Sequence, residues 1–500
     1  MTKFDRRQFL RTVCAGAACA LTAAGRTAWA ETAPKTNVLF IAVDDLRPQL
    51  GCYGDPMVKT PNLDRLAGRG TVFQRAYCQQ AVCSPSRTSL LTGRRPDTTR
   101  VYDLVVHFRK NLPDVATLPE WFKQHGYHAQ GFSKIFHDGL DDKQSWTVPH
   151  WNPDAKSYLL PENQALVERL KAEAKVGGSK KKRDRIRGVP WEAPDAADNE
   201  LADGKTADKA IETLAGLTDK PFFLAVGFRR PHLPFIAPKK YWDLYNRDDI
   251  QLADNPFAPK DAPDCALTDW GELRNYYGMP KEGPVSDDQA RSLIHGYYAS
   301  ASYTDAQIGR VIDELERLGL RERTAIVVWG DHGWQLGEHG LWCKHTNFET
   351  SAHAPLIMSA PGQKAAGGKT DALVEFVDIY PSLCEVCGLP LSEGLEGTSF
   401  APLLDDPARP WKTAAFSQYP RFKEGVGLLM GYSMRTDRYR FTAWKCADKK
   451  EFAEYELYNH QTDADENVNI AGLPENEALV KELAAKLDAG WRQAGPPPAG

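Results

Sequence analysis

The sequence predicts an α/β fold built on a mainly parallel sheet, and two observations support this. Apolar runs typical of buried parallel strands occur at NVLFIAVDD (37–45), HAQGFSKIFH (128–137), FFLAVGFRRPH (222–232) and TAIVVWGDHG (324–333). Helical segments separate the runs, and the longest, from about Ser286 to Leu318, carries Ile308, Val311, Ile312, Leu315 and Leu318 on one stripe. Strands that alternate with helices indicate an α/β architecture, and a length of 500 residues favours two domains.

Each predicted strand leads into polar residues that strand packing does not require. They are Asp44 and Asp45 in the first run, Lys134 and His137 in the second, His232 in the third, and Asp331 and His332 in the fourth. Because ligands bind outside the carboxyl ends of the strands in open α/β sheets, we expect these side chains to meet in one cleft. Each alone has an ordinary alternative, since an Asp can cap a helix, a His can be solvated and a Lys can snorkel.

Three of these residues predict a divalent metal site. Asp44, Asp45 and Asp331 would repel one another in one site unless a cation neutralised them. Oxygen ligands favour a hard ion, calcium or magnesium, over zinc, and His332 is an unusual ligand for calcium. Around the ion, Lys134, Lys344 and Arg87 would bind an anion's oxygens, and His137 and His232 would transfer protons.

The stretch QQAVCSPSRTSLLTGRRPD (79–97) predicts a short helix with a cysteine at its entrance. Ser84 suits the N-cap, Pro85 the first helical position and Gly93 the stop. Cys83 then enters a helix N-terminus, where unpaired amides favour an anion, either a thiolate or an oxyanion of a substrate. A buried structural cysteine is the alternative, and position alone does not decide between them.

Composition and the chain ends bear on location and partners. A net charge of −4 with 42% hydrophobic residues provides no global basic field, which argues against nucleic-acid binding. Arg6 and Arg7, an apolar stretch and an Ala-Trp-Ala ending at Ala30 predict a Tat-type signal peptide over residues 1–30, hence a periplasmic or secreted protein. No later segment offers about 18 uninterrupted apolar residues, so we expect no membrane span. Cys384 and Cys387 are expected to be core residues of a helix from about Pro381 to Gly388.

The motif C-x-P-x-R followed by T-G-R, in CSPSRTSLLTGR, resembles that of type I sulfatases, in which the cysteine is converted to formylglycine. DDLRPQLGCYGD, SKIFHDG, PHLPFIAPKKY and DHGWQLGEHGLWCKHTNFE resemble the iduronate-2-sulfatase branch more closely. The likeness runs from residue 36 to about 470, except for a segment from about Asp154 to Ala197 that contains the basic run KKKRDRIR (180–187). That run is predicted to be a solvated insertion, with a glycan-binding patch as the alternative.

The resemblance implies an alkaline-phosphatase-like catalytic domain, residues 31–409, in which helices flank the mainly parallel sheet. A smaller C-terminal α+β subdomain, residues 410–500, would contain an antiparallel sheet, and YSMRTDRYRFTAWK (432–445) followed by AEYELYNHQTDADENVN (453–469) independently predicts two strands and a turn.

The resemblance also implies roles for the site residues. Calcium would be held by Asp44, Asp45, Asp331, His332 and the modified Cys83. Arg87 would fix the aldehyde hydrate, and Lys134 and Lys344 would neutralise sulfate oxygens. His232, or else Lys344, would protonate the leaving alcohol, and His137 would deprotonate the second hydroxyl. The implied partners are a sulfated carbohydrate, such as a 2-O-sulfated iduronate or related uronate of a glycosaminoglycan, and a maturase that makes formylglycine.

Two other classes of protein compete with this interpretation. A metal-dependent phosphatase or phosphodiesterase of the same superfold would ordinarily have a Ser or Thr nucleophile and more zinc-type ligands. A sulfated-glycan-binding protein would not need the complete set of Cys83, Arg87, aspartates, lysines and histidines.

Overall fold

A computed structural model describes residues 35–176, 187–446 and 453–497. Residues 36–500 form one compact unit. The predicted signal peptide and most of the basic run 180–187 lie outside the described residues. Within the described residues, no helix combines the length and the apolar character needed to cross a membrane.

The central sheet has seven strands. Their order across the sheet is β11 (Gly368–Glu375), β2 (Thr71–Tyr77), β10 (Leu356–Ser359), β7 (Thr324–Gly330), β1 (Asn37–Val43), β5 (Phe222–Phe228) and β3 (His128–Ser133). The four apolar runs identified in the sequence are the adjacent strands β7, β1, β5 and β3, which pair in parallel. Only β10 runs antiparallel to its neighbours among the described strands of this sheet. The prediction of a mainly parallel sheet is therefore confirmed.

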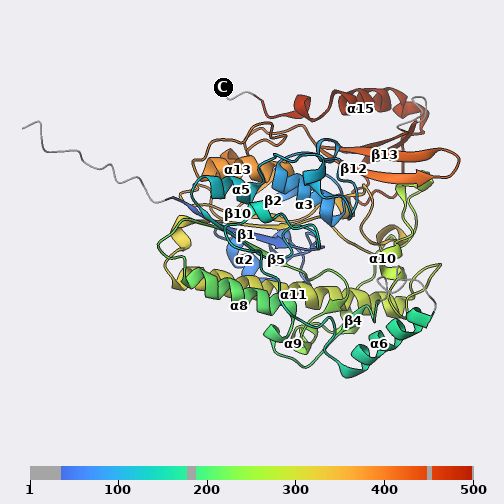
Figure 1. Ribbon diagram of the computed structural model, residues 1–500. Helices are drawn as coiled ribbons and strands as arrows, with labels where there is room; N and C mark the ends of the chain where they lie inside the picture. Colours follow the sequence, from blue (N-terminus) through green and yellow to red (C-terminus); the bar gives the residue numbers. More distant parts are fainter. Residues whose placement is uncertain (1–34, 177–186, 447–452, 498–500) are drawn as a thin grey trace, which may run out of the picture. The chain divides into compact units, whose positions relative to one another are not determined.

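Helices cover both faces of this sheet (Figure 1). On one face, Leu39, Ile41 and Val43 of β1 pack in a cluster with α2 (Pro61–Ala67), α8 (Ala202–Ala215) and α11 (Asp287–Arg317). On the other, Val38 and Phe40 pack with α3 (Cys83–Thr92), α5 (Leu118–Gln124) and α13 (Ile379–Val386). Because side chains alternate along a strand, an entirely apolar β1 supplies both layers of the core.

Two predicted helices agree with the structure to within two residues at each end. Helix α11 starts after Ser286, whose side chain caps it in a reciprocal arrangement with Gln289. Helix α13 ends before Cys387, which is half-buried, whereas Cys384 is buried, and both are free thiols.

The C-terminal part contains a second, antiparallel sheet. It consists of β12 (Ala414–Lys423), β13 (Gly427–Thr436), β14 (Tyr439–Cys446) and β15 (Ala453–Asn459), in that order. Helix α15 (Glu477–Ala489) packs on it through Leu483 and Leu487, which contact a cluster that includes Phe441 and Leu457. The stretches 432–445 and 453–469, predicted to form two strands and a turn, contain parts of three strands, because the chain turns between β13 and β14 within the first stretch. The domain boundary near residue 410 stays a prediction.

The remaining α-helices and strands are short, except for α6. They are α4 (Pro96–Thr99), α6 (Pro161–Val176), α9 (Lys239–Trp242), α10 (Gly271–Arg274), α12 (Glu349–Ala352), α14 (Ala401–Asp405), β4 (Trp191–Glu192), β6 (Phe235–Ile236), β8 (Gln335–Leu336) and β9 (Trp342–Cys343).

Candidate active site

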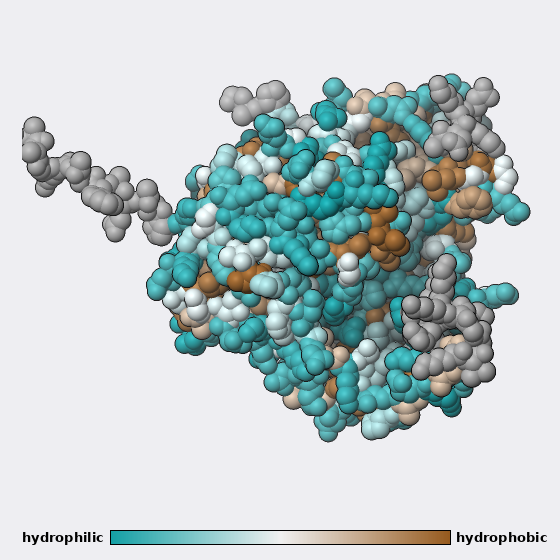
Figure 2. All heavy atoms as spheres, in the orientation of Figure 1, coloured by the Kyte–Doolittle hydropathy of each residue, from teal (hydrophilic) through white to brown (hydrophobic). Residues whose placement is uncertain are grey.

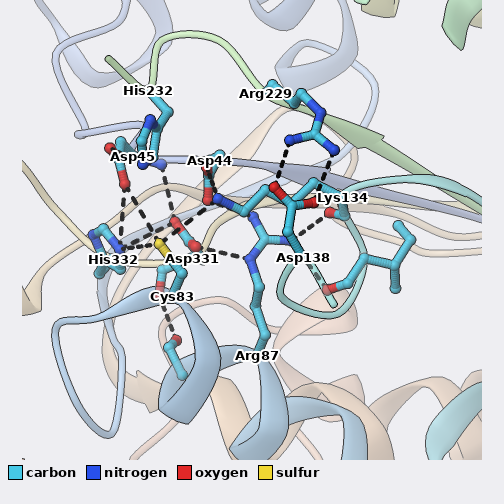
Figure 3. A network of polar contacts seen from close by, with 12 residues as sticks. Asp44, Asp45, Cys83, Arg87, Lys134, Asp138, Arg229, His232, Asp331 and His332 are labelled. Carbon is cyan, nitrogen blue, oxygen red and sulfur yellow. Dashed lines mark hydrogen bonds and ion pairs between the residues drawn. The ribbon is translucent and has the colours of Figure 1, made fainter. Parts of the chain in front are cut away.

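The predicted site residues converge at the carboxyl ends of the parallel strands (Figure 3). Asp44 and Asp45 follow β1, Asp331 and His332 follow β7, His232 follows β5, and Lys134 follows β3, while Cys83 and Arg87 lie in α3 and Lys344 follows β9. The backbone extends the sheet by one residue here, since Asp44 N donates to Phe228 O at 3.0 Å and Asp331 N donates to Val43 O at 3.2 Å. Asp45 then has a φ of 61°, which turns the chain out of the sheet.

Helix α3 begins earlier than predicted. Val82, with extended backbone (φ −158°, ψ 142°), is the N-cap, and Cys83 is the first helical residue. Ser84 therefore does not cap the helix, because the bond from Ser86 N to Val82 O at 3.1 Å already closes the first turn around it. Gly93 ends the helix with a φ of 64°, as predicted.

Arg87 is fully buried and joins three strand ends. Its Nε donates to Asp331 Oδ2 at 2.8 Å, one Nη donates to Asp44 Oδ1 at 3.0 Å, and the other donates to Ile135 O at 3.0 Å. Burial opposes its charge, but Asp331 and Asp44 outweigh burial and raise the pKa of Arg87. The guanidinium thus fixes two carboxylates in place, and its predicted contact with an aldehyde hydrate stays a prediction.

Two buried lysines pair with the remaining carboxylate oxygens. Lys134 Nζ forms an ion pair with Asp44, and Lys344 Nζ lies 3.0 and 3.1 Å from the two Asp45 oxygens. Burial alone would raise the pKa of Asp44, but Lys134 and Arg87 hold it well below its ordinary value. The three aspartates are therefore matched by three basic side chains. The mutual repulsion of these carboxylates, which predicts a cation, is therefore already relieved by basic side chains of the protein.

The donor set around His332 nevertheless fits a metal ion. Its Nδ1 lies 2.9 Å from Gly333 O and donates to it, so Nε2 faces the site. That Nε2 lies 3.3 Å from Asp45 Oδ1, 3.6 Å from Asp331 Oδ1 and 3.4 Å from Cys83 Sγ. Donor atoms of Asp44, Asp45, Cys83 and His232 lie within 4.8 Å of one another, and so do those of Cys83, Asp331 and His332. Cys83 belongs to both groups, and the carboxylate oxygens favour a hard cation.

Cys83 is buried among polar groups. Its side chain is almost fully enclosed, with 2% exposure, and Sγ lies 4.0 Å from Lys134 Nζ and 3.9 Å from Asp45 Oδ1. Burial and the Asp44 carboxylate raise the pKa of this thiol well above its ordinary value. A thiolate, one alternative for this helix position, is therefore disfavoured. The polar surroundings also differ from the apolar packing expected of a structural cysteine.

His232 is held by groups that accept hydrogen bonds. Its Nδ1 lies 2.5 Å from Leu233 O, and its Nε2 lies 3.2 Å from Glu272 Oε1 and 3.7 Å from Asp45 Oδ2. Since a carbonyl oxygen only accepts, Nδ1 donates to Leu233 O, and Nε2 faces the two carboxylates. This arrangement suits a proton donor.

Glu272, in α10, is the residue that sequence reasoning missed. Its carboxylate contacts Lys344 Nζ at 3.0 Å as well as His232. Burial raises its pKa, but Lys344 and His232 outweigh that effect and hold the pKa well below its ordinary value. Asp45 and Glu272 in turn outweigh burial at Lys344, whose pKa lies well above its ordinary value, so Lys344 is a poorer proton donor than the sequence suggested.

His137 lies half-buried beside this cluster and lines the same cavity. Burial and the charge of Lys134 lower its pKa to about 4. It is therefore neutral near pH 7, and its role as a base stays a prediction.

These residues form the inner end of a cavity of about 900 Å³. Asp44, Cys83, Lys134, His137, His232 and Lys344 all line it. Seven lysines and arginines line the cavity against three acids, Asp44, Asp138 and Glu272, so its walls favour an anion. Figure 2 shows that the face drawn there is mostly hydrophilic, with a hollow to the right of centre.

Comparison with known proteins identifies the class. The family model for Sulfatase matches residues 36–389, and the model for N-sulphoglucosamine sulphohydrolase, C-terminal, matches residues 337–493. The chain belongs to the sulfatase family, and it is a sulfuric ester hydrolase. Within the family it is iduronate-2-sulfatase-like: it is 34% identical over 523 residues to iduronate 2-sulfatase of Mus musculus, covering 89% of this chain and 93% of the mouse protein.

Solved structures agree with the fold. A protein in complex with its substrate D-glucosamine-2-N,6-O-disulfate superposes with a TM-score of 0.71 at 22% identity, covering 91% of this chain and 97% of the other. Phosphonate monoester hydrolase of Agrobacterium radiobacter gives a TM-score of 0.71 at 24% identity, covering 91% and 95%. The predicted alkaline-phosphatase-like sheet with a C-terminal antiparallel sheet is thus confirmed.

Proposed function

We propose that the enzyme hydrolyses the 2-O-sulfate ester of iduronate, or of a related uronate, in a sulfated glycosaminoglycan. The position of Cys83 carries the proposal: the cysteine of the sulfatase motif lies within 4.0 Å of Lys134 Nζ and within 3.4 Å of His332 Nε2, at the inner end of a cationic cavity. The likeness to mouse iduronate 2-sulfatase supports the sugar, and a sulfated saccharide of another kind is the alternative.

Two groups complete the proposed site. Formylglycine made from Cys83 would supply, as its hydrate, a hydroxyl nucleophile that attacks sulfur and a second hydroxyl whose deprotonation expels sulfate. Calcium would be held by Asp44, Asp45, Asp331 and His332 together with the modified residue 83, and would act as a Lewis acid. The polar groups around Cys83 and the inward-facing Nε2 of His332 support this assignment.

The chain's own residues then have separate tasks. Lys134 and Lys344 orient the sulfate and neutralise its oxygens as negative charge moves toward the leaving alcohol. His232 delivers a proton from Nε2 to that alcohol, and neutral His137 removes a proton from the second hydroxyl. Arg87 keeps Asp44 and Asp331 in position through bonds of 3.0 and 2.8 Å.

Basic side chains other than Lys134 and Lys344, which are assigned to the sulfate, support selectivity for a uronate. Arg229 forms two bonds with Asp138, at 2.7 and 2.8 Å, and Arg230 donates to backbone oxygens of His232 and Ile236. Both arginines line the cavity, where a substrate carboxylate could compete for them.

The decisive experiment examines residue 83 directly. Peptide mass spectrometry of active protein should find formylglycine or its hydrate at position 83, and the rate of sulfate release should follow the converted fraction. Sulfated disaccharides from heparin and dermatan, with neutral sulfated sugars and a phosphonate monoester for comparison, would define the substrate. Full activity with an unmodified thiol, or in Cys83→Ala, would contradict the proposal and favour the phosphatase-like alternative.

We also propose that residues 1–30 direct Tat export to the periplasm or beyond and that a maturase in the host converts Cys83. Mass spectrometry of the periplasmic fraction should find a chain that begins at Glu31. Recovery of the full-length chain from the cytoplasm alone would argue against export.

A further inference from the structure

The segment 154–197, in which the sequence showed no likeness to iduronate-2-sulfatase, forms one wall of the active-site cavity. Lys156, Tyr158, Val167, Lys171 and Arg187, here called the insertion wall, all lie between residues 154 and 197 and all line the cavity that contains Cys83. Lys171 and Val167 lie on α6, which Figure 1 shows near α9 and β4. Part of this segment therefore faces the active-site cavity, whereas most of the basic run 180–187, predicted to be a solvated insertion, lies outside the described residues.

This wall is anchored to the body of the enzyme. Tyr158 is 6% exposed and its hydroxyl donates to Val189 O at 2.8 Å, while its ring packs in a cluster with Ile236 and Tyr303. Glu192 is buried and accepts from Leu159 N at 2.7 Å and from Asn163 at 2.6 Å, which fixes the approach to α6. The lysines on the wall are thus carried by a packed segment.

Lys156 and Lys171 of the insertion wall are not engaged by acids of the cavity. Lys156 Nζ bonds only weakly to a neutral amide, Gln164 Oε1 at 3.4 Å, and Lys171 pairs with exposed Glu168 on its own helix at 2.9 Å. The three acids among the described lining residues lie outside the insertion. Lys134 and Lys344, by contrast, are buried and paired with aspartates.

The size of the cavity leaves room beyond the reacting sugar. Its volume of about 900 Å³ lies near the upper end of the roughly 300–1,000 Å³ usual for small-molecule sites. The cavity extends from Cys83 to the insertion wall, so a saccharide whose sulfate lies at Cys83 can continue toward Lys156 and Lys171.

We propose that the insertion wall binds a sulfate group on the sugar next to the one whose ester is hydrolysed. The inference rests on the proposed function and extends it: the preferred substrate is a sulfated oligosaccharide rather than a monosaccharide. Lys156 and Lys171 act as mobile point charges, so this contribution to binding weakens as salt is added.

Binding to inactive protein tests the proposal separately from catalysis. In the Cys83→Ala background, calorimetry would compare two heparin tetrasaccharides that are identical except that one lacks sulfate on the second sugar. The substitutions Lys156→Gln and Lys171→Gln together should weaken binding of the fully sulfated probe about tenfold, the effect of losing two partly exposed charged contacts. Binding of the other probe should change less than about twofold.

A matched control removes two charges elsewhere. Arg169 is exposed on the same helix and pairs with Glu173 at 3.7 Å, and Lys220 is exposed in the loop between α8 and β5; neither lines the cavity. Arg169→Gln with Lys220→Gln should leave both affinities unchanged. Lys171→Glu alone, on the exposed face of α6, provides a second variant and should weaken binding of the fully sulfated probe further.

The insertion wall is not a subsite if the two lysine substitutions weaken binding of both probes equally or of neither. The same holds if the control pair of substitutions weakens binding as much. Failure of both probes to bind the Cys83→Ala protein would also overturn the subsite. If the binding selectivity is found but protein with formylglycine at residue 83 releases no sulfate, the proposed function fails while the subsite stands.

Discussion

Glu272→Gln tests whether the buried carboxylate of α10 supports proton donation by His232. The substitution keeps the shape of the side chain and removes one of the two carboxylates near His232 Nε2, the nearer one at 3.2 Å. Lys344 keeps both contacts to Asp45, at 3.0 and 3.1 Å, so binding of the sulfate should change little.

The magnitude follows from the bond that is lost. A hydrogen bond to a charged group contributes about 1.5–3 kcal/mol, and about 1.4 kcal/mol is a factor of ten in rate. If that stabilisation is used while His232 protonates the alcohol, kcat for a sugar sulfate should fall about 10- to 150-fold. A 4-nitrophenyl sulfate, whose leaving group needs no proton, should lose less than about threefold.

The ratio of the two losses is the informative measurement. Asp138→Asn, which removes a carboxylate from the same cavity without a contact to His232, should affect both substrates alike, and Glu272→Asp should partly restore the sugar sulfate rate. If Glu272→Gln lowers both rates by the same factor, Glu272 acts through sulfate binding or folding, and the reasoning about proton donation is wrong.

Three further results are expected. Burial raises the pKa of Glu456 to about 7, so the wild type loses stability as pH rises from about 4.5 to 7. In urea unfolding, the free energy of unfolding of Glu456→Gln should therefore increase by up to about 3 kcal/mol relative to that of the wild type between pH 4 and pH 8. The same dependence of unfolding free energy on pH in both proteins would contradict this. Chelation should lower the Tm, and calcium added at about 100 times its Kd should restore it, which corresponds to a stabilisation of about 2.7 kcal/mol. Identical Tm values with and without the chelator would exclude a bound calcium. Gly227→Ala would place a methyl 2.3 Å from Lys134 O, so it should lower kcat and cost about 1–3 kcal/mol, while Gly472→Ala, in open space, should do neither; equal effects would refute the steric argument.

The strands and the convergence of the site could be predicted because they follow from local patterns. Strands β1, β5 and β7 are buried on both faces, so nearly every residue in them is apolar, and their polar residues stand out at the ends. The parallel arrangement then brings those ends to one edge of the sheet. Helix α11 was predicted from its periodicity, and Ser286 and Gln289 give its start a recognisable cap.

What the sequence did not reveal depends on contacts between distant segments. Glu272 lies in a helix of four residues, with no periodicity or motif around it, and gains its role only because Lys344 and His232 fold against it. The start of α3 was misplaced for a similar reason. Ser86 donates its hydroxyl to Asp331 O, across the site, and the extended backbone of Val82 sets the cap without a side-chain bond.

The charge balance of the site suggests why a metal would matter there. Arg87, Lys134 and Lys344 already neutralise Asp44, Asp45 and Asp331, so the inner end of the cavity has little net charge to attract a sulfate ester. A divalent cation held by the aspartates would make this end positive, and the carboxylate oxygens would turn from the lysines toward the cation. Lys134 and Lys344 would then be free to meet the sulfate oxygens. On this argument a metal would serve to release the lysines for the substrate, because basic side chains already relieve the repulsion among the carboxylates.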